Sequence, residues 1–401
     1  MLDLLLRPGT AADVDRLVEI HLSAYPDPRS LAARRRRFES PPFGHPDCVV
    51  VAEHQGAIVG HALSLRMSLC AVGHTLPVTG VATVGVAPEA RGLGVATRLV
   101  RHIEAQALAR GDVASVLYPF RQGFYARLGY VASAPYKRVG FVPAAVPRAW
   151  ALGGRAWLRG PGAATHQQIE ALYHRVALQR LGALLRDSVS WQSRFADERL
   201  QWLFAGVGDQ LLGYATFSPE NDEPHARTTA LVGEICAQEP WVERGLWAAL
   251  GAQRSQISRF DVDLADDDPM PLALLDPDAD RHGTATLEHA FGEVCTGPML
   301  KLLAPAQVLA ARGYVGEGQV TLSVGAMPLH LSVREGRGTV TETAPSADAI
   351  PLSPEALGAL ALGGVRASEL WHQGALDCGA SQVRELDALF AGPRYFSRDP
   401  F

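Results

Sequence analysis

Lysine is nearly absent from this 401-residue chain: Lys137 and Lys301 stand alone, and arginine supplies the other basic side chains. The formal net charge of −5 leaves no basic surplus of the kind that nucleic-acid-binding domains carry, so we expect no nucleic-acid partner. The five cysteines include no C-x-x-C pair, which argues against a zinc site or a disulfide framework and predicts buried thiols in a reducing cytoplasm. No apolar run reaches about 18 residues, and the acidic N-terminus does not resemble a signal peptide, so no membrane span is predicted.

The composition that remains is typical of globular domains, with 47% hydrophobic and 20% charged residues. The chain is longer than one hydrophobic core normally serves, so two or three domains are expected. These properties together predict a soluble cytoplasmic protein that holds no metal.

Residues 81–99 carry the clearest functional signal. Residues 81–86 are small or β-branched, as in a buried strand, and Pro88 ends that strand because it has no N–H to donate. Apolar residues recur every four positions from Val95 onward, which predicts a helix that begins near residue 94. The first N–H groups of a helix have no internal partner and carry the positive end of its dipole, so they can bind an anion such as a diphosphate.

The loop between this strand and this helix has the pattern Arg-x-x-Gly-x-Ala over residues 91–96. No Gly-Lys-Ser follows, so it is not a Walker loop, and it lacks the G-x-G-x-x-G spacing of dinucleotide-binding folds. It resembles the acetyl-CoA loop of the GNAT acetyltransferases. A plain turn of small residues is the alternative, and the surrounding sequence has to decide between the two.

A second segment, residues 123–130, supports the GNAT resemblance. It reads Gly-Phe-Tyr-Ala-Arg-Leu-Gly-Tyr and follows a predicted strand at 113–118 that Pro119 closes. In the GNAT fold a short helix at this place leads into a strand, and all these elements occur here in the same order. We therefore predict a GNAT acetyltransferase domain over residues 1–150.

Four consecutive arginines, residues 34–37, lie upstream of these motifs. A solvated helix face is the simpler interpretation, and the alternative is that they contact cofactor phosphates or the rim of a pocket. Ahead of them Thr10 and Asp13 resemble a capping box, and the helix predicted to follow has an apolar face that ends at His21.

The pattern of the first domain recurs, more weakly, in the middle of the chain. Strands and a helix follow in the same order, but residues 238–241, Gln-Glu-Pro-Trp, replace the glycine loop. Glu239 and Glu243 would repel a diphosphate. The acidic run at 276–280 lacks the glycine and glutamate of a calcium loop, which favours a solvated loop. These features predict a second GNAT-like domain over residues 151–300 that lacks the CoA loop.

The composition changes once more in the last quarter of the chain. Residues 319–324 and 329–333 alternate apolar and polar side chains as half-buried strands do, and Ser353 with Pro354 marks a helix start. The last eight residues, 394–401, are rich in aromatics, whereas a loose tail would be polar. We therefore expect the end of the chain to be buried.

With three parts in this order, the whole chain resembles the enhanced intracellular survival (Eis) family of acetyltransferases. The segments that carry the resemblance are residues 84–88, Arg91 with Gly94, 124–130, 268–276, 310–314 and the terminal Phe401. It implies an α/β (α+β) chain: two GNAT-like mixed-sheet domains followed by a sterol-carrier-protein-like α/β domain at residues 301–401. It also implies acetyl transfer from acetyl-CoA directly to an amine and, as in many members, a homohexamer.

The resemblance implies roles for individual residues as well. Tyr125 would be the general acid, the C-terminal carboxylate of Phe401 the general base, and Asp27 would face the substrate. Acetyl-CoA would be bound at Val84, Gly85, Val86, Arg91, Gly92, Leu93, Gly94, Val95, Ala96 and Thr97. A main-chain N–H of residues 84–86, at a bulge in the strand, would meet the developing oxyanion.

Simple acid–base chemistry explains why both catalytic groups are needed. An alkyl ammonium has a pKa of about 10, so it must lose a proton before it attacks, and a carboxylate with a reference pKa of about 3.5 becomes a useful base only when burial raises that pKa. A phenol can give its proton to the departing sulfur. The alternatives are a tail that merely packs and a core tyrosine, Tyr125, whose hydroxyl meets a main-chain partner.

Two departures from the family pattern bear on the substrate. Gly92 and Leu93 stand where arginines are usual, which weakens side-chain contacts to the phosphates but leaves the main-chain amides. Pro400 stands where an acidic residue would attract a cation, so acceptance of aminoglycosides is in doubt. The acceptor could therefore be a small amine, similar to an aminoglycoside or a polyamine, or the lysine side chain of a protein. The remaining alternative is that the protein is not an enzyme but a sensor that binds acyl-CoA or lipid.

Overall fold

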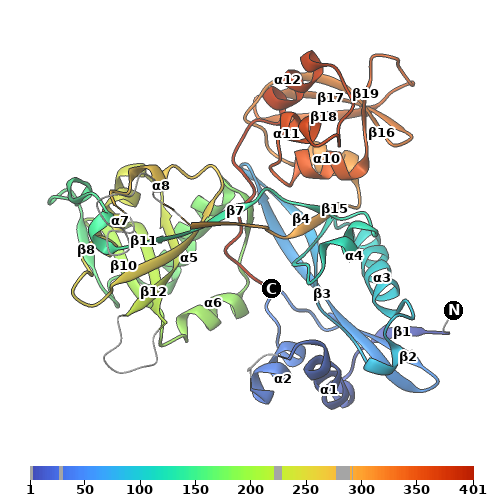
Figure 1. Ribbon diagram of the computed structural model, residues 1–401, viewed down its shortest axis with the longest axis horizontal. Coiled ribbons are helices and arrows are strands. Elements are labelled where there is room, and N and C mark those ends of the chain that lie inside the picture. The colour runs from blue at the N-terminus through green and yellow to red at the C-terminus, as the bar shows by residue number, and fades with distance from the viewer. Residues whose placement is uncertain (1–2, 27–29, 221–227, 277–289, 291) are drawn as a thin grey trace.

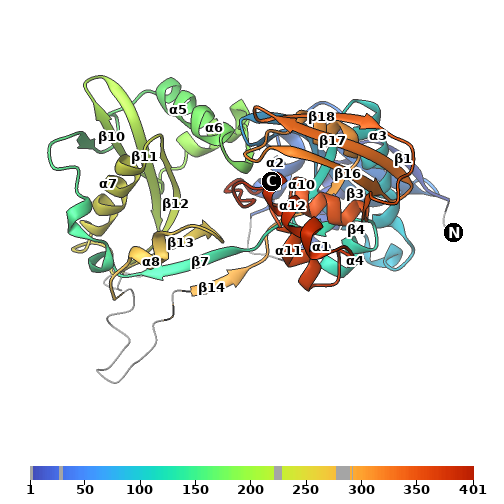
Figure 2. The same cartoon turned by 90° about the horizontal axis from the view of Figure 1, so that it is seen from above.

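The computed structural model describes residues 3–26, 30–220, 228–276, 290 and 292–401 of the chain. Within these residues the strands form three sheets, which we use to define an N-terminal, a central and a C-terminal domain. Figure 1 shows the three domains around the C-terminus of the chain, and Figure 2, turned by 90°, again places that terminus between the N-terminal and central domains.

The N-terminal sheet runs in the order β1-β2-β3-β4-β5-β15-β6, with β9 added beside β3. Its strands are β1 (Leu5–Pro8), β2 (Val49–His54), β3 (Ala57–Ala71), β4 (His74–Val86), β5 (Ala114–Leu117), β6 (Val131–Ala132), β9 (Leu181–Leu184) and β15 (Met299–Leu302). The helices of this domain are α1 (Val14–Ala24), α2 (Leu31–Glu39), α3 (Val95–Ala109) and α4 (Gln122–Ala126).

Helices α1 and α3 cover opposite faces of this sheet. The buried face of α1 shares a core cluster with Leu63 of β3, and the buried face of α3 shares another with Ala62. Adjacent residues of a strand point to opposite faces, so the two helices lie on either side. The predicted capping box before α1 is present: the Thr10 N–H donates to Asp13 Oδ2 at 2.7 Å.

The central sheet has the order β14-β7-β13-β12-β11-β10-β8. Its strands are β7 (Tyr136–Phe141), β8 (Trp157–Arg159), β10 (Gln201–Val207), β11 (Gln210–Pro219), β12 (Thr229–Ala237), β13 (Arg259–Ala265) and β14 (Gly292–Cys295). The helices are α5 (His166–Leu178), α6 (Ser188–Phe195), α7 (Pro240–Gly251) and α8 (Met270–Ala273). The strand pair, the following strand and the helix that the sequence predicts here are β10, β11, β12 and α7.

The C-terminal sheet has the order β18-β17-β16-β19. Its strands are β16 (Gly318–Val324), β17 (Met327–Arg334), β18 (Arg337–Glu342) and β19 (Ile350–Leu352). The helices are α9 (Pro305–Ala311), α10 (Pro354–Ala361), α11 (Ala367–His372) and α12 (Ala380–Leu389). The Ser353 hydroxyl accepts the Ala356 N–H at 3.0 Å, which confirms the predicted start of α10.

Some strands join a sheet other than that of their neighbours in sequence. β7 pairs with β13 and β14 of the central sheet, whereas β9 pairs with β3 and β15 inserts between β5 and β6 of the N-terminal sheet. The domain boundaries at residues 150 and 300 stay a prediction. The pairings show that strands, and not only linkers, join the N-terminal and central domains.

The arginine run is only partly the solvated face that we expected. Arg35 and Arg36 are exposed on α2, but Arg34 is 2% exposed and donates to the Tyr25 carbonyl oxygen at 2.9 Å. Arg37 is half-buried and, as described below, lines a cavity. Helical periodicity explains the difference, because Arg34 and Phe38 lie on the buried side of the same helix.

The cysteines are free thiols; Cys48, Cys70 and Cys236 are buried as expected, whereas Cys295 and Cys378 are half-buried. Among the described residues, no helix is both long and apolar enough to cross a membrane. The same residues contain no cluster of three or more His, Cys, Asp or Glu side chains that could hold a metal ion. Most of the acidic run at 276–280 lies outside the described residues.

One buried histidine predicts how stability depends on pH. His61 of β3 is 0% exposed, and burial, helped by the nearby His21, lowers its pKa from 6.5 to about 3. Below about pH 6.5 the imidazole of His61 binds a proton in the unfolded chain, whereas in the folded chain it does so only near pH 3. The folded state therefore loses stability as the pH falls from about 6.5 to about 3. His61 contributes at most about 1.4 kcal/mol per pH unit to the fall in the free energy of unfolding.

The measurement is the free energy of unfolding in urea between pH 7 and 4. His61→Leu is expected to make this free energy depend less steeply on pH, whereas His372→Leu, at an exposed histidine, is the control and leaves the dependence unchanged. An unchanged pH dependence in His61→Leu would contradict the prediction.

Candidate active site

The N-terminal sheet opens between two of its strands. β4 and β5 pair in parallel over only three positions, from Val78 with Ala114 to Gly80 with Val116. Beyond Gly80, β4 continues to Val86 without β5 as its partner. Main-chain N–H and C=O groups require hydrogen-bond partners, so residues 81–86 present groups that another chain segment or a ligand can meet.

A bulge distorts β4 at the same place. The register against β3 passes directly from Leu63–Ala82 to His61–Gly85, so that Thr83 and Val84 together oppose one residue of β3. Thr83 has a φ of +52°, a left-handed conformation that is strained for a β-branched residue. The Tyr25 hydroxyl, just after α1, donates to the Val84 carbonyl oxygen at 3.1 Å and braces the bulge.

A groove of about 780 Å³ runs from this bulge along the N-terminus of α3. Gly92 and Gly94 have φ values of +78° and +81°, and a Cβ on either would meet no atom within 4 Å, so the loop needs glycine for its backbone conformation. The first turn of α3 contains no acidic residue. The helix N-terminus therefore faces an open groove with nothing to repel an anion.

Most of the predicted cofactor residues line this groove. Those that do are Val84, Val86, Arg91, Gly92, Gly94, Val95, Ala96 and Thr97. Gly85 instead faces His61, where a Cβ would lie 2.5 Å from Nε2, and Leu93 is 50% exposed outside the groove. Whether these residues bind a cofactor stays a prediction.

Arg91 is bonded to the protein itself. Its Nη2 donates to the Ser23 carbonyl oxygen at 2.9 Å and its Nε to the Val86 carbonyl oxygen at 3.3 Å. The side chain thereby ties the loop to the end of α1 and to the end of β4. This supports a role for Arg91 in holding the loop in shape.

Two other arginines that our sequence analysis did not single out also line the groove. Arg121 and Arg127 flank the Phe124–Tyr125 pair and are exposed. Within the described part of the chain no ion pair or hydrogen bond is found for either guanidinium group. Arg127 lies inside the motif at 123–130, so its spacing from Tyr125 was the signal that could have identified it.

A smaller cavity of about 150 Å³ adjoins the groove, and both Tyr125 and Phe401 line it. Tyr25 and Val84 line the groove and the cavity alike, so the two meet at the bulge. The remaining wall residues are His21, Arg37, Val81, Ala82, Thr83 and Tyr118. The structure thus brings the two predicted catalytic residues, which are far apart in the sequence, into one cavity.

Tyr125 is held by aromatic neighbours. It is 3% exposed, and its ring packs edge-on against Phe124 at 4.9 Å and Tyr130 at 5.9 Å between centroids. Burial raises the pKa of its phenol well above the usual value, so the group stays protonated at neutral pH. Among the residues that the structure describes, nothing hydrogen-bonds to its hydroxyl, so the main-chain partner considered in the sequence analysis is not found there.

Phe401 enters the opening of the sheet. Its ring is 5.2 Å from that of Tyr118 between centroids, and a Cβ on Gly80 would lie 3.0 Å from its Cε2. Gly80 is the last residue of β4 that pairs with β5. The terminal side chain therefore packs where the two strands part. The predicted burial of the tail holds only in part: Arg394, Tyr395 and Asp399 are buried, residues 396–398 and Phe401 are half-buried, and Pro400 is exposed.

Arg37 lines this cavity. For the arginine run our sequence analysis preferred a solvated face and gave the rim of a pocket as the alternative, and the alternative holds for Arg37. Its Nη1 donates to the Thr83 Oγ1 at 3.3 Å, next to the bulge. The predicted substrate residue Asp27 lies outside the described residues.

A third cavity of about 340 Å³ lies on the other side of Tyr118. The tail residues Phe396 and Pro400 form one wall, and Leu231 and Asp263 of the central domain form another. Because Tyr118 lines this cavity and the one around Tyr125, the two adjoin. A molecule larger than the inner cavity therefore has room toward the central domain.

Three parts of the chain match known domain families. Residues 6–132 match the acetyltransferase (GNAT) domain, residues 182–293 match a second acetyltransferase (GNAT) domain family, and residues 306–397 match the sterol carrier protein domain. These matches agree with the predicted fold class of two GNAT-like domains and a sterol-carrier-protein-like domain.

The sequence is also similar to named proteins over most of its length. It is 30% identical over 364 residues to the N-acetyltransferase Eis of Mycobacterium bovis and to that of Mycobacterium tuberculosis, covering 86% of this chain and 86% of each relative.

Solved structures share the whole fold. A GCN5-related N-acetyltransferase from Anabaena variabilis superposes with a TM-score of 0.85 at 20% identity, covering 100% of both chains. One from Kribbella flavida gives 0.82 at 24% identity, covering 100% of this chain and 98% of the other. Eis1 from Mycobacterium abscessus gives 0.79 at 22% identity, covering 99% and 100%.

The contact between Gly80 and Phe401 is testable. In Gly80→Ala the new methyl would lie 3.0 Å from Phe401 Cε2 and 2.8 Å from Met67 Cε, so the terminal ring is expected to shift outward. The measurement is the rate at which carboxypeptidase Y releases the terminal phenylalanine, which should rise several-fold. Gly123→Ala, where a Cβ meets nothing within 4 Å, is the matched control. Equal release rates in both variants would show that Phe401 does not rest on Gly80.

Proposed function

The chain belongs to the Eis family of N-acetyltransferases, and from that membership we propose that it transfers the acetyl group of acetyl-CoA directly to a primary amine of a small molecule. The observation that carries the proposal is one junction: at the β4 bulge, a groove suited to an anion meets a cavity lined by a buried phenol and the terminal residue. The assay is release of free thiol from acetyl-CoA with aminoglycosides, polyamines and lysine peptides as acceptors.

The groove supports acetyl-CoA as the donor, which supplies the acetyl group. Main-chain N–H groups of residues 91–97 would hold the diphosphate at the N-terminus of α3, where no acidic side chain opposes it. Arg121 and Arg127 would add positive charge along the same groove. Val84 and Val86 would line the way to the inner cavity, and an N–H in residues 84–86 would stabilise the negative charge that develops on the acetyl oxygen.

The chain's own groups would then move the protons. The Phe401 carboxylate would take one proton from the ammonium of the acceptor, and the neutral nitrogen would form the C–N bond as the C–S bond breaks. Tyr125 would give its phenolic proton to sulfur and recover one from the nitrogen. The nitrogen thus loses two protons, of which one ends on the thiol and one leaves through the carboxylate.

The cavities support a small acceptor. The space beside Tyr125 is about 150 Å³, enough for an amino group and a few carbon atoms, and the adjoining 340 Å³ beyond Tyr118 would take the rest of the molecule.

The state of assembly and the compartment belong to the same proposal. We expect a cytoplasmic homo-oligomer, as in many members of the family. Exposed apolar side chains on the central domain support association: Leu275 is 65% exposed and Val294, on the edge strand β14, is 72% exposed. A molar mass of one chain, measured by light scattering, would contradict the proposed homo-oligomer.

The terminal carboxylate is tested by moving it. Adding one glycine after Phe401 shifts the carboxylate by about 3.5 Å along the chain and is expected to lower kcat at least tenfold, because the base no longer reaches the amine. Phe401→Leu keeps the carboxylate in place while it changes the ring, and should lose much less. Unchanged turnover in the extended chain would end the assignment of Phe401 as the base.

The phenol is tested by removing one oxygen atom. Tyr125→Phe keeps the aromatic packing and is expected to lower kcat at least tenfold while the Kd for coenzyme A stays unchanged, because only the proton donor is lost. Tyr118→Phe is the matched control, since it removes a hydroxyl from the same cavity and keeps the ring against Phe401. If Tyr125→Phe and Tyr118→Phe turn over equally fast, Tyr125 is not the acid.

A further inference from the structure

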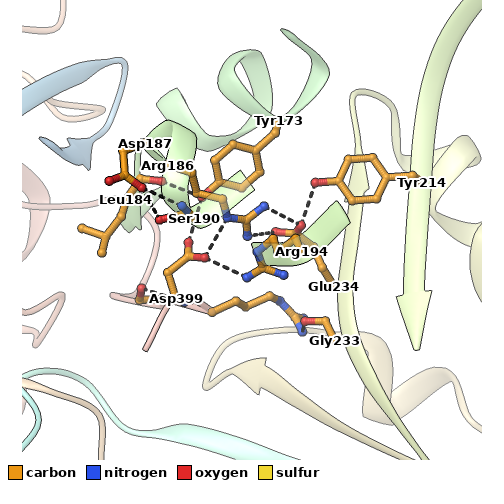
Figure 3. A network of polar contacts seen from close by, with 12 residues as sticks. Tyr173, Leu184, Arg186, Asp187, Ser190, Arg194, Tyr214, Gly233, Glu234 and Asp399 are labelled. Carbon is orange, nitrogen blue, oxygen red and sulfur yellow. Dashed lines mark hydrogen bonds and ion pairs between the residues drawn. The ribbon is translucent and has the colours of Figure 1, made fainter. Parts of the chain in front are cut away.

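A buried network of charged groups joins the central domain to the tail. Arg186, whose side chain is 0% exposed, donates from Nη1 and Nη2 to the two carboxylate oxygens of Glu234 at 3.0 and 2.9 Å. Its Nε donates to Asp399 Oδ1 at 2.7 Å, and Arg194 Nη2 donates to the same oxygen at 2.8 Å. Figure 3 shows Asp399 meeting both guanidinium groups. Two positive and two negative charges balance within this network.

Tyrosines complete the surroundings of these groups. The Tyr214 hydroxyl donates to Glu234 Oε2 at 2.6 Å, and the Tyr173 hydroxyl lies 3.0 Å from Asp399 Oδ2 (Figure 3). The Arg186 guanidinium also stacks on the Tyr173 ring, 3.8 Å from its centroid. Asp399 Oδ1 thus receives two guanidinium donors although the side chain is only 7% exposed, while the single proton of the Tyr173 hydroxyl is shared between Asp399 Oδ2 and the Leu184 carbonyl oxygen, which is 2.6 Å away.

Such a network is poorly explained by stability alone. Removing charged groups from water costs several kcal/mol each, and well-packed apolar residues in their place are often as stable or more so. What a buried, directional network provides is one defined arrangement of the segments that it joins. Here the joined segments are the central domain and a residue two positions before the end of the chain.

Other contacts hold the tail along the same path. The Phe396 N–H donates to the Leu181 carbonyl oxygen at 2.9 Å, and Arg398 Nη1 donates to the Gly233 carbonyl oxygen at 3.1 Å. Gly182 has a φ of +96°, and a Cβ there would lie 2.8 Å from the Tyr395 ring, so the tail passes close over β9. Contacts of residues 395–398 thus set the path of the tail, and the ion pairs of Asp399 fix its position.

This anchor lies within reach of the catalytic cavity. Two residues span at most about 7 Å, so fixing Asp399 confines the Phe401 carboxylate to a small volume. In the central domain, α7 takes the place that α3 has in the N-terminal domain, and it is poorly suited to bind an anion because it begins after Glu239 and carries Glu243 in its first turn. What the central domain contributes to the site is the anchoring of the tail.

We propose that Asp399 is a positioning residue, held by Arg186 and Arg194, that places the terminal carboxylate of Phe401 beside the acceptor amine. The central domain, which lacks the glycine loop, serves the reaction by anchoring the end of the chain. This inference rests on the proposed function, because it gives Asp399 a role only through the Phe401 carboxylate.

The test compares three Asp399 variants with a matched control. Asp399→Asn keeps the shape and removes the charge, and is expected to lower kcat about tenfold with the KM for acetyl-CoA unchanged, since the groove along α3 is untouched. Asp399→Glu keeps the charge but lengthens the side chain, and should lower kcat while the Tm stays within about 2 °C of the parent. Asp112→Asn is the control: that aspartate pairs with Arg110 at 2.6 Å, is 9% exposed, and touches no tail residue. Its kcat at 25 °C should match that of the parent.

A double variant separates positioning from general destabilisation. If Asp399 acts through Phe401, Asp399→Asn combined with one added terminal glycine should lose no more kcat than the glycine extension alone, because both changes remove the same contribution. Multiplied losses in the double variant, or equal losses in Asp399→Asn and Asp112→Asn, would overturn the proposal. Should Asp399→Asn not fold, Asp399→Glu with unchanged kcat would overturn it as well.

The outcomes also distinguish the two levels of the argument. If the glycine extension leaves kcat unchanged, the terminal carboxylate is not the base and the proposed function fails in that part. If the extension lowers kcat but no Asp399 variant does, the anchor alone is wrong and the base assignment stands.

Discussion

The parting of β4 from β5 after Gly80 is the constraint on which the rest of this structure depends. Two strands that stop pairing expose main-chain groups that must find other partners. On one side the Tyr25 hydroxyl satisfies the Val84 carbonyl oxygen, and on the other the ring of Phe401 covers Gly80. The groove and the inner cavity lie along this opening and meet at the bulge. Without the opening, the groove, the inner cavity and the end of the chain would not meet.

The domains are tied to this opening by contacts between segments remote in sequence. β9 of the following segment pairs with β3, and β15 completes the sheet beside β5. The tail leaves the C-terminal domain, crosses β9 of the N-terminal sheet and is bound by Arg186 and Arg194 before Phe401 enters the opening between β4 and β5. Each domain therefore contributes to one site: the first a groove, the second an anchor, and the third the segment that is anchored.

Local pattern was enough to predict much of this arrangement. The periodicity after Val95, the glycines at 92 and 94, and the motif at 123–130 each depend on residues near one another in sequence, and the structure has α3, a left-handed loop and α4 at those places. The same reasoning was wrong for Arg34, because a run of charge says nothing about which side of a helix meets the core. It gave no role to Arg121 or Tyr118 and preferred a solvated face for Arg37, because the places of these residues in the cavities depend on how distant segments fold together.

By itself the sequence determined which short segments form the loop, the helix after it and the aromatic tail, since these depend on local spacing and composition, and its resemblance to the Eis family implied the kinds of domains. Only the tertiary structure decided that Phe401 and Tyr125 share a cavity and that Asp399 meets two arginines of another domain. The physical reason is that contacts between residues hundreds of positions apart depend on how sheets stack and strands pair. Which charged side chains pair in the interior also cannot be predicted from the sequence, because the partners come together only in the folded chain.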